Sequence, residues 1–211
     1  MSRSGGFLIL LPALLACCGC ASISPPAKVI DPVPIYLAEY AIHSDVFMPE
    51  DDKFVAYTFG DWNYAALGHT WPTDAVGALL VSWGSTLERR EAPVDPRTGG
   101  PLLYDQPDLL IRLEASRSQV QQRLIVLEKR FADDLKSAGP EGVVFNVDHT
   151  RTYVKDQQHY SIFNDCNDLT ADNLRALGFH VDGFVVGSHF HVFEGSDEPE
   201  AEAARATADS P

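Results

Sequence analysis

The sequence has little positive charge. Its 211 residues include 16 Lys and Arg against 30 Asp and Glu, which gives a formal net charge of -14 at pH 7. Proteins that bind nucleic acid in a groove, or anionic lipid through surface charge, need clustered cations. No basic patch is visible along the chain. The composition therefore argues against a nucleic-acid partner and against electrostatic attachment to a membrane.

The sequence also lacks a hydrophobic run long enough to span a bilayer near its start. Residues 7–16 (FLILLPALLA) are apolar, but a spanning helix needs roughly 20 such residues. A short apolar run after Arg3, followed by small residues and cysteines, is typical of an export signal. It predicts either plain secretion or, as we favour, a lipoprotein.

The cysteines at the end of this run specify the kind of anchor. Residues 14–17 (LLAC) resemble the bacterial lipobox, in which Cys17 would be lipidated, and Cys20 is the alternative acceptor. Acyl chains on one cysteine would make the membrane a partner of the protein. The residue after Cys17 is Cys18 and not an aspartate, which by enterobacterial sorting rules favours the outer membrane facing the periplasm.

Cysteine is scarce in the rest of the chain. Three of the four cysteines lie within the first twenty residues, so the folded part keeps only Cys166. In an oxidising compartment structural cysteines pair, and an unpaired one is a candidate reactive thiol. A disulfide to Cys18 or Cys20 would tie the core to a flexible tether, so we expect Cys166 to be free. The alternative is a small apolar residue packed under a turn.

Composition divides the chain into four segments. Residues 1–20 form the signal and lipobox, and residues 21–34 a Pro-rich tether. Residues 35–194 form one α+β domain. Residues 195–211 are acidic and Ala-rich without a large hydrophobe, so a disordered tail is expected.

Hydrophobic patterning predicts the elements of the domain. Strands are expected at residues 35–42, 54–59, 109–113, 142–147, 152–155 and 184–193, with an irregular Pro-rich loop at 91–106. One buried helix is expected at 75–83. A longer helix should begin at Ser116 or Ser118 and end at Gly139, with Val120, Leu124, Leu127, Phe131 and Leu135 as its apolar stripe.

The segment around Cys166 carries the clearest signal. Residues 160–163 indicate a short strand, and an amphipathic helix capped by Asn164 or Asp165 should follow and end at Gly178. Cys166 then lies at or next to the helix N-terminus. The unpaired N–H groups there stabilise an anion, which favours a thiolate.

A thiolate nucleophile needs a histidine that takes and returns its proton, and a polar group that orients the ring. His43 is the best placed, because it follows an apolar strand and should emerge at a sheet edge. Tyr160 and Asn164 could line the site, and the backbone N–H of Cys166 is a natural oxyanion donor. The candidates for orienting the imidazole are, in order of preference, Asp61, Asp45 and His69.

Other motifs are weaker. Trp62, Tyr64 and Trp71 could form a stacking platform for a substrate, although aromatic loop residues more often cover the core. His189 and His191 have the spacing of a zinc ligand pair, but no nearby residue completes the set, so no metal is expected. The chain contains no phosphate-binding loop, dinucleotide fingerprint or Gly-x-Ser-x-Gly elbow, and no cofactor is predicted.

Four motifs in this order resemble an uncharacterised bacterial envelope family, a domain of unknown function first noted near urease genes. They are IHSDVFMP (42–49), FGDWNY (59–64), LIRLEASRSQVQQRL (110–124) and YSIFNDCNDLTADNLRALGF (160–179). That family is similar to the circularly permuted, papain-like thiol hydrolases, relatives of NlpC-type peptidases and lecithin–retinol acyltransferases.

The resemblance implies an α+β fold in which a central antiparallel sheet packs against the helix carrying Cys166 and a long second helix. It also implies Cys166 as nucleophile and His43 as base. Two positions depart from the family pattern. Ser44–Asp45 follows the histidine where a small residue is usual, and Asp165 precedes the cysteine. An acid at that position would raise the thiol pKa.

Two functions fit these observations. The first is an envelope lipoprotein with a Cys–His thiol hydrolase or acyltransferase site, acting on an amide, ester or thioester of a cell-wall peptide or acylated envelope component. The second is a catalytically inactive lipoprotein that uses the same cleft for binding or envelope maintenance.

Overall fold

The computed structural model describes residues 21–68, 82, 84–146, 150–161, 163–183 and 188–193. The predicted signal segment at 1–20 and the predicted tail at 195–211 lie outside these residues. The helix expected at 75–83 lies outside them as well, apart from residue 82.

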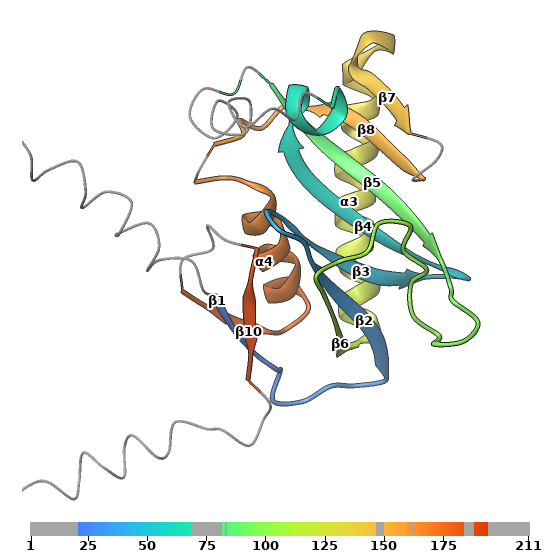
Figure 1. Ribbon diagram of the computed structural model, residues 1–211. Helices are drawn as coiled ribbons and strands as arrows, with labels where there is room; N and C mark the ends of the chain where they lie inside the picture. The colour runs from blue at the N-terminus through green and yellow to red at the C-terminus, as the bar shows by residue number, and fades with distance from the viewer. Residues whose placement is uncertain are drawn as a thin grey trace, which may run out of the picture.

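A strongly twisted antiparallel sheet of seven strands forms the centre of the described chain (Figure 1). Its strand order is β6-β2-β3-β4-β5-β8-β7. The strands are β2 (Pro32–Glu39), β3 (Ser44–Glu50), β4 (Lys53–Asp61), β5 (Ser85–Pro93), β6 (Leu109–Ser116), β7 (Val143–Asn146) and β8 (Arg151–Asp156). Together with the helices below, this sheet confirms the predicted α+β class.

A smaller sheet joins the two ends of the described chain. Strand β1 (Ala21–Ser24) lies between β9 (His180–Asp182) and β10 (Phe190–Val192), antiparallel to the first and parallel to the second. An extended tether is predicted over residues 21–34, but this prediction is wrong for Ala21–Ser24, because these residues form β1 and the side chain of Ile23 is fully buried in the core. Residues 32–34 likewise belong to β2.

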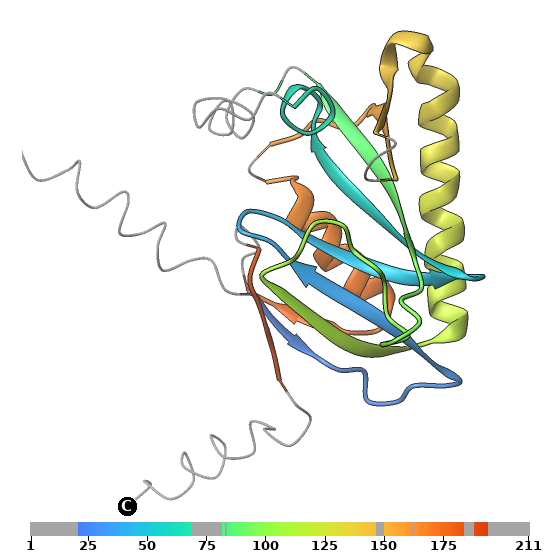
Figure 2. The same cartoon turned by 45° about the vertical axis from the view of Figure 1, so that its right-hand side comes forward.

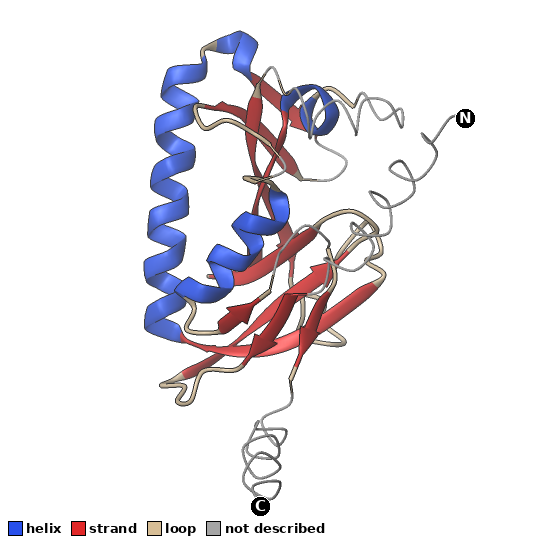
Figure 3. Cartoon of the chain, turned by 90° about the vertical axis from the view of Figure 1, so that its left-hand side faces the viewer, coloured by secondary structure: helices blue, strands red, loops and turns tan. Residues whose placement is uncertain are grey.

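The two α-helices that the described residues form pack on the same face of the large sheet. Helix α3 (Arg117–Ala138) runs along the length of the sheet, and helix α4 (Cys166–Ala176) packs beside α3, as Figures 2 and 3 show. A π-helical turn, η1 (Trp62–Ala66), follows β4, and a 3₁₀ turn, η2 (Pro140–Gly142), follows α3. None of the described helices is both long and apolar enough to cross a membrane.

Strand alternation divides the core into two clusters. In β2, Ile35 and Leu37 point toward the helices, whereas Tyr36 and Ala38 point to the opposite face, because successive side chains of a strand alternate. That opposite face is covered by the loop between β5 and β6, which inserts Leu103 against it. The helix-side cluster is the larger one and contains the buried aliphatic and aromatic residues of α3 and α4.

Several local predictions differ from the structure. Strand β5 begins at residue 85 and extends into the stretch expected to be a loop from residue 91. The short strand predicted at 160–163 is absent from its described residues 160, 161 and 163, where only an isolated bridge joins Ser161 to Asn164. The stripe of α3 is buried as expected through Phe131, but Leu135 is 45% exposed and Asp134 is buried in its place.

Asp134 is a buried carboxylate on α3, close to Asp156 of β8. It is only 5% exposed, and its Oδ2 atom has no hydrogen-bond partner among the described residues. Burial, followed by the charge of the neighbouring Asp156 carboxylate, raises the pKa of Asp134 to about 6. The folded state therefore disfavours the ionised form of this residue.

We expect Asp134→Asn to increase the free energy of unfolding at pH 7 by roughly 1 to 3 kcal/mol, since the pKa of Asp134 rises from about 4 to about 6 on folding and a pKa difference of one corresponds to about 1.4 kcal/mol. Because Asp134 binds its proton more tightly in the folded state, its unfavourable contribution grows as pH rises from about 4 to about 6. Urea unfolding at pH 7 and pH 4 measures the difference, which should disappear at the lower pH.

Asp133→Asn is the matched control, because Asp133 is adjacent in sequence but 50% exposed and paired with Lys129 on the surface. Its effect should be small at both pH values. A destabilising effect of Asp134→Asn at pH 7 would contradict the assigned electrostatic cost.

Candidate functional site

Helix α4 begins at Cys166, as the sequence predicts. Asp165 occupies the N-cap, where its carboxylate accepts hydrogen bonds from the backbone N–H groups of Asn167 and Asp168. The Asp168 carboxylate accepts in turn from the Asp165 N–H, which completes a capping box. Gly178, with a φ of 91°, lies just beyond the helix in the left-handed region that glycine favours. Cys166 is thus held at the first turn, and among the described residues it is a free cysteine.

His43 lies in the tight turn that joins β2 to β3. The predicted strand over 35–42 ends earlier, at Glu39, so His43 immediately precedes β3 and does not end the first strand. The backbone N–H of Tyr40 donates to the His43 carbonyl at 2.9 Å and closes the turn. The Tyr40 ring stacks on the imidazole with centroids 4.5 Å apart and 7° between the planes. This stacking limits how the ring can turn.

Two buried hydrogen bonds attach the start of β3 to the start of α4. The Ser44 hydroxyl donates to Asn167 Oδ1 at 3.1 Å, and the Thr170 hydroxyl donates to the Ser44 carbonyl at 2.7 Å. Ser44 follows His43 and Asn167 follows Cys166 in the chain. These bonds therefore hold the histidine turn and the cysteine helix next to each other, although the two lie more than 120 residues apart in sequence.

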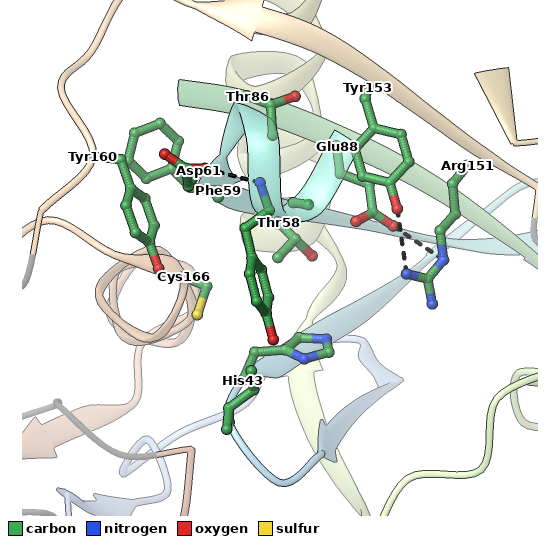
Figure 4. Close-up of a pocket in the computed structure, with 14 residues that line it drawn as sticks. His43, Thr58, Phe59, Asp61, Thr86, Glu88, Arg151, Tyr153, Tyr160 and Cys166 are labelled. Atoms are coloured by element: carbon green, nitrogen blue, oxygen red, sulfur yellow. Dashed lines mark hydrogen bonds and ion pairs between the residues drawn. The ribbon is translucent and has the colours of Figure 1, made fainter. Parts of the chain in front are cut away.

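Cys166 and His43 line the same pocket, which has a volume of about 250 Å³. Figure 4 shows the sulfur and the imidazole ring on the same side of this space, the first from α4 and the second from the turn before β3. The His43 side chain is 28% exposed, whereas Cys166 is only 8% exposed. The thiol is thus reached through the pocket and not from the open surface.

The partner of His43 is Asp45, and not Asp61 as first preferred. Asp45 Oδ2 lies 3.5 Å from His43 Nε2 and 3.6 Å from Arg90 Nη1, and the Thr58 hydroxyl donates to the other carboxylate oxygen. Asp45 is the second residue of β3 and lies only two residues beyond His43, so the two side chains are close enough to contact each other. Its carboxylate is 2% exposed.

These contacts set the charge of both residues. Burial lowers the pKa of His43, but the hydrogen bond and the negative charge of Asp45 raise it more, and the charge of Glu88 adds to the rise. The pKa of His43 therefore lies above its ordinary value. Burial raises the pKa of Asp45, but His43, Arg90 and Thr58 outweigh it and hold that pKa well below its usual range. Asp45 is thus ionised at neutral pH.

The thiol of Cys166 is neutral at rest, which differs from the thiolate expected at a helix N-terminus. Burial raises its pKa well above the ordinary value, and the negative charges of Asp165 and Asp45 raise it further. The backbone N–H groups of Cys166 and Asn167 act in the opposite direction, but they are outweighed. Activation of the sulfur would consequently require a base that removes its proton.

Tyr160 stands beside the sulfur, as Figure 4 shows. It lines the pocket and is 9% exposed. Burial raises the pKa of its hydroxyl well above the usual range, and the neighbouring charges and a hydrogen bond to Cys166 contribute. The phenol is therefore a neutral donor next to the sulfur.

The other residues expected at the site have different positions. Tyr64 lines the pocket, and Asp61 lines it as well while capping η1 through the Tyr64 N–H and accepting from the Ser82 hydroxyl. Trp62 and Asn164 do not line it. Trp62 packs beneath the Lys155 ammonium, 5.0 Å from the ring centroid, and the Asn164 amide donates to a neighbouring backbone carbonyl. His69, Trp71 and the lipidation candidates Cys17 and Cys20 lie outside the described residues.

Sequence reasoning missed the polar end of the pocket. Glu88 from β5 and Arg151 and Tyr153 from β8 line it, and Figure 4 shows them across the pocket from Cys166. Glu88 Oε1 lies 3.4 Å from Arg151 Nε. Glu88 pairs in register with Thr58 and Tyr153, so these side chains share one face of the sheet. Only knowledge of this strand pairing would have brought them together.

His189 contacts a carboxylate that its sequence neighbours did not suggest. Its Nδ1 atom lies 3.2 Å from Oε2 of Glu39, a buried residue at the end of β2. His191 instead packs edge-on against Phe193. Within the part of the chain that the structure describes, no three His, Cys, Asp or Glu side chains are grouped so that they could hold a metal ion.

Comparisons with known proteins give no match: no protein-family model, no curated protein and no solved structure matches this chain. The function is therefore inferred from the geometry and chemistry of the pocket and from the motifs that carry the family resemblance.

Proposed function

We propose that this protein is a cysteine-dependent hydrolase or acyltransferase of the permuted papain-like kind, held in the bacterial envelope by a lipid on Cys17 or Cys20. One observation carries the proposal: Cys166 and His43 line one pocket, and the imidazole of His43 pairs with the buried carboxylate of Asp45. This set supplies a nucleophile, a base and a group that orients the base.

The geometry supports the following order of events. Neutral His43 takes the proton from the Cys166 thiol, and the sulfur attacks the carbonyl carbon of the substrate. Asp45 stabilises the imidazolium that forms, because it is already ionised. The imidazolium then gives its proton to the leaving group as the acyl–sulfur bond forms and the original bond breaks. In the next step His43 deprotonates water or a second nucleophile, which attacks the acyl carbon; the acyl–sulfur bond breaks, and the imidazolium returns its proton to the sulfur of Cys166.

Two donors are available for the oxyanion that forms during attack. The backbone N–H of Cys166 lies at the free N-terminus of α4, where N–H groups lack helical partners. The Tyr160 hydroxyl is neutral and lies beside the sulfur. A pocket of about 250 Å³ fits a small acyl or aminoacyl group. A peptide, ester or thioester of the cell wall or of an acylated envelope component is the proposed substrate class.

The raised thiol pKa favours a second candidate, a lipoprotein that uses the pocket for binding without catalysis. A buried cysteine with a neutral thiol next to an aspartate is also what a packing role would produce. The two functions differ in whether His43 controls the chemistry of the sulfur.

Labelling of Cys166 by iodoacetamide at pH 7.5 distinguishes them. In the full chain we expect modification of Cys166, identified by mass spectrometry, and a rate at least tenfold lower in His43→Ala, because the base that removes the thiol proton is lost. His180→Ala is the matched control, since His180 is 74% exposed and paired with Asp182 on the surface. Its labelling rate should equal that of the wild type.

Labelling that is slow and insensitive to His43→Ala would support the binding function and contradict the enzyme. Circular dichroism of each variant shows whether the fold is retained, so that a loss of reactivity through unfolding is recognised.

A further inference from the structure

A chain of ion pairs of alternating sign begins and ends in the pocket. Its members, in order of contact, are His43, Asp45, Arg90, Asp105, Arg151 and Glu88. The four inner members carry two negative and two positive charges, which cancel. The protonation of the two ends therefore determines the net charge of the chain.

The two ends both face the pocket together with Cys166. Glu88 has a side chain that is 9% exposed, and its ion pair with Arg151 is long, at 3.4 Å. Arg151 Nε has no hydrogen-bond partner among the described residues, and the same guanidinium also pairs with Asp105. The Glu88 carboxylate is thus only partly compensated, and a buried carboxylate in this position readily takes up a proton.

We propose that Glu88 is a positioning residue that controls whether His43 carries its proton, so that the two ends of the chain share one proton between them. An ionised Glu88 favours the imidazolium of His43. A protonated Glu88 favours the neutral imidazole, which is the form that can accept the proton of Cys166. A shift of the proton from one end to the other leaves the net charge of the pocket unchanged.

The surroundings of Glu88 agree with this role. Burial raises its pKa to about 7, the charge of Asp45 raises it as well, and the charges of Arg151, Arg90 and His43 lower it. Glu88 in turn contributes to the raised pKa of His43. The titratable and charged groups that face Glu88 are Arg151 and Tyr153 from β8, Arg90 from its own strand, Asp45 from β3, and His43 from the turn.

This inference rests on the proposed function only in its consequence for Cys166. If His43 is the base, Glu88 sets the pH above which the thiol becomes reactive. The protonation of His43 itself can be measured without any reaction, so the two proposals can fail separately.

The test is a pH titration of the His43 ring by NMR in the full chain. The protein has seven histidines, and the His43 signals are assigned as those missing from His43→Gln. We expect Glu88→Gln to lower the pKa of His43 by roughly 0.5 to 1, because a nearby negative charge is removed. Glu91→Gln, on the same strand but 37% exposed and paired with Lys53, should leave that pKa unchanged.

A His43 pKa that is the same in Glu88→Gln and the wild type would overturn the proposal, as would an equal shift in Glu91→Gln. The wild type provides a second measurement in case Glu88→Gln does not fold. Two coupled sites broaden each other's titration, so the His43 curve should have a Hill coefficient below one. A simple one-site curve would overturn the proposal.

The effect of Glu88 on the reactivity of the Cys166 thiol is measured in the same variants. The midpoint of the pH dependence of Cys166 labelling should fall by the same amount as the His43 pKa in Glu88→Gln. Labelling insensitive to pH and to His43, combined with the expected His43 titrations, would contradict the enzyme function while supporting the role of Glu88.

Discussion

Asp45→Asn is expected to lower the free energy of unfolding by about 3 kcal/mol and to bring the pKa of His43 below its ordinary value. The destabilisation arises because the change removes one member of a buried charge network and leaves Arg90 with less compensation. The pKa falls because the favourable charge of Asp45 is lost, whereas the burial of His43, which opposes its ionisation, remains. Urea unfolding and an NMR titration of His43 measure the two effects.

The loss of stability should depend on pH in a defined direction. The pKa of Asp45 is depressed in the folded state, so its contribution is present above an unfolded pKa of about 4 and is lost as pH falls toward the folded value. The pKa of His43 is raised, so its contribution is complete below about pH 6.5 and is lost as pH rises through the folded pKa. The effect of Asp45→Asn should therefore be largest between roughly pH 4 and 6.5.

Asp61→Asn is the matched control, because Asp61 lies in the same pocket but interacts with Ser82 and the Tyr64 backbone. It should leave the pKa of His43 nearly unchanged. The opposite pattern, a large pKa change in Asp61→Asn and none in Asp45→Asn, would restore Asp61 as the residue that orients the base.

Asp165→Asn is expected to raise the rate of Cys166 labelling at pH 8 about tenfold. After burial, the charge of Asp165 is the largest cause of the raised thiol pKa. If the loss of this charge lowers the thiol pKa by about one, ten times more thiolate is present. Asparagine caps a helix as well as aspartate does, so α4 should remain intact. Iodoacetamide kinetics across a pH series measure the change.

The increase should depend on the ionisation of Asp165. Burial raises the pKa of Asp165 to about 6, so the wild-type residue is charged above that pH and neutral well below it. The ratio of the two rates should therefore fall toward one near pH 5. Asp172→Asn serves as control, since Asp172 lies on the same helix but is 63% exposed. An equal acceleration in that variant would show that general surface charge, and not the N-cap, controls the thiol.

The local structure around Cys166 could be predicted from sequence because its signals are local. The cap at Asp165 and the glycine at 178 lie within one turn of the helix ends that they define. The long helix α3 was equally recognisable from its apolar stripe and the Gly139–Pro140 stop. Each of these features depends on neighbours within four residues.

The partner of His43 and the polar end of the pocket depend on strand pairing. Asp61 is the candidate favoured by sequence because it ends a neighbouring strand, yet Asp45, two residues from His43, makes the contact with the imidazole. The prolines and the Gly99–Gly100 pair predict a loop from Glu91 onward, whereas β5, with the sequence STLERREAP, continues to Pro93 and contains four charged residues. Two of these, Glu88 and Arg90, are buried because other strands supply opposite charges, which a single stretch of sequence does not reveal.

The position of β1 limits how far the domain can stand from a bilayer. Its four residues are hydrogen-bonded between β9 and β10, and Cys20 is the residue immediately before them. If Cys17 or Cys20 carries the lipid, the connecting backbone can reach at most roughly 15 Å even when fully stretched. The folded body would then lie close against the headgroups and could not move away from the membrane surface.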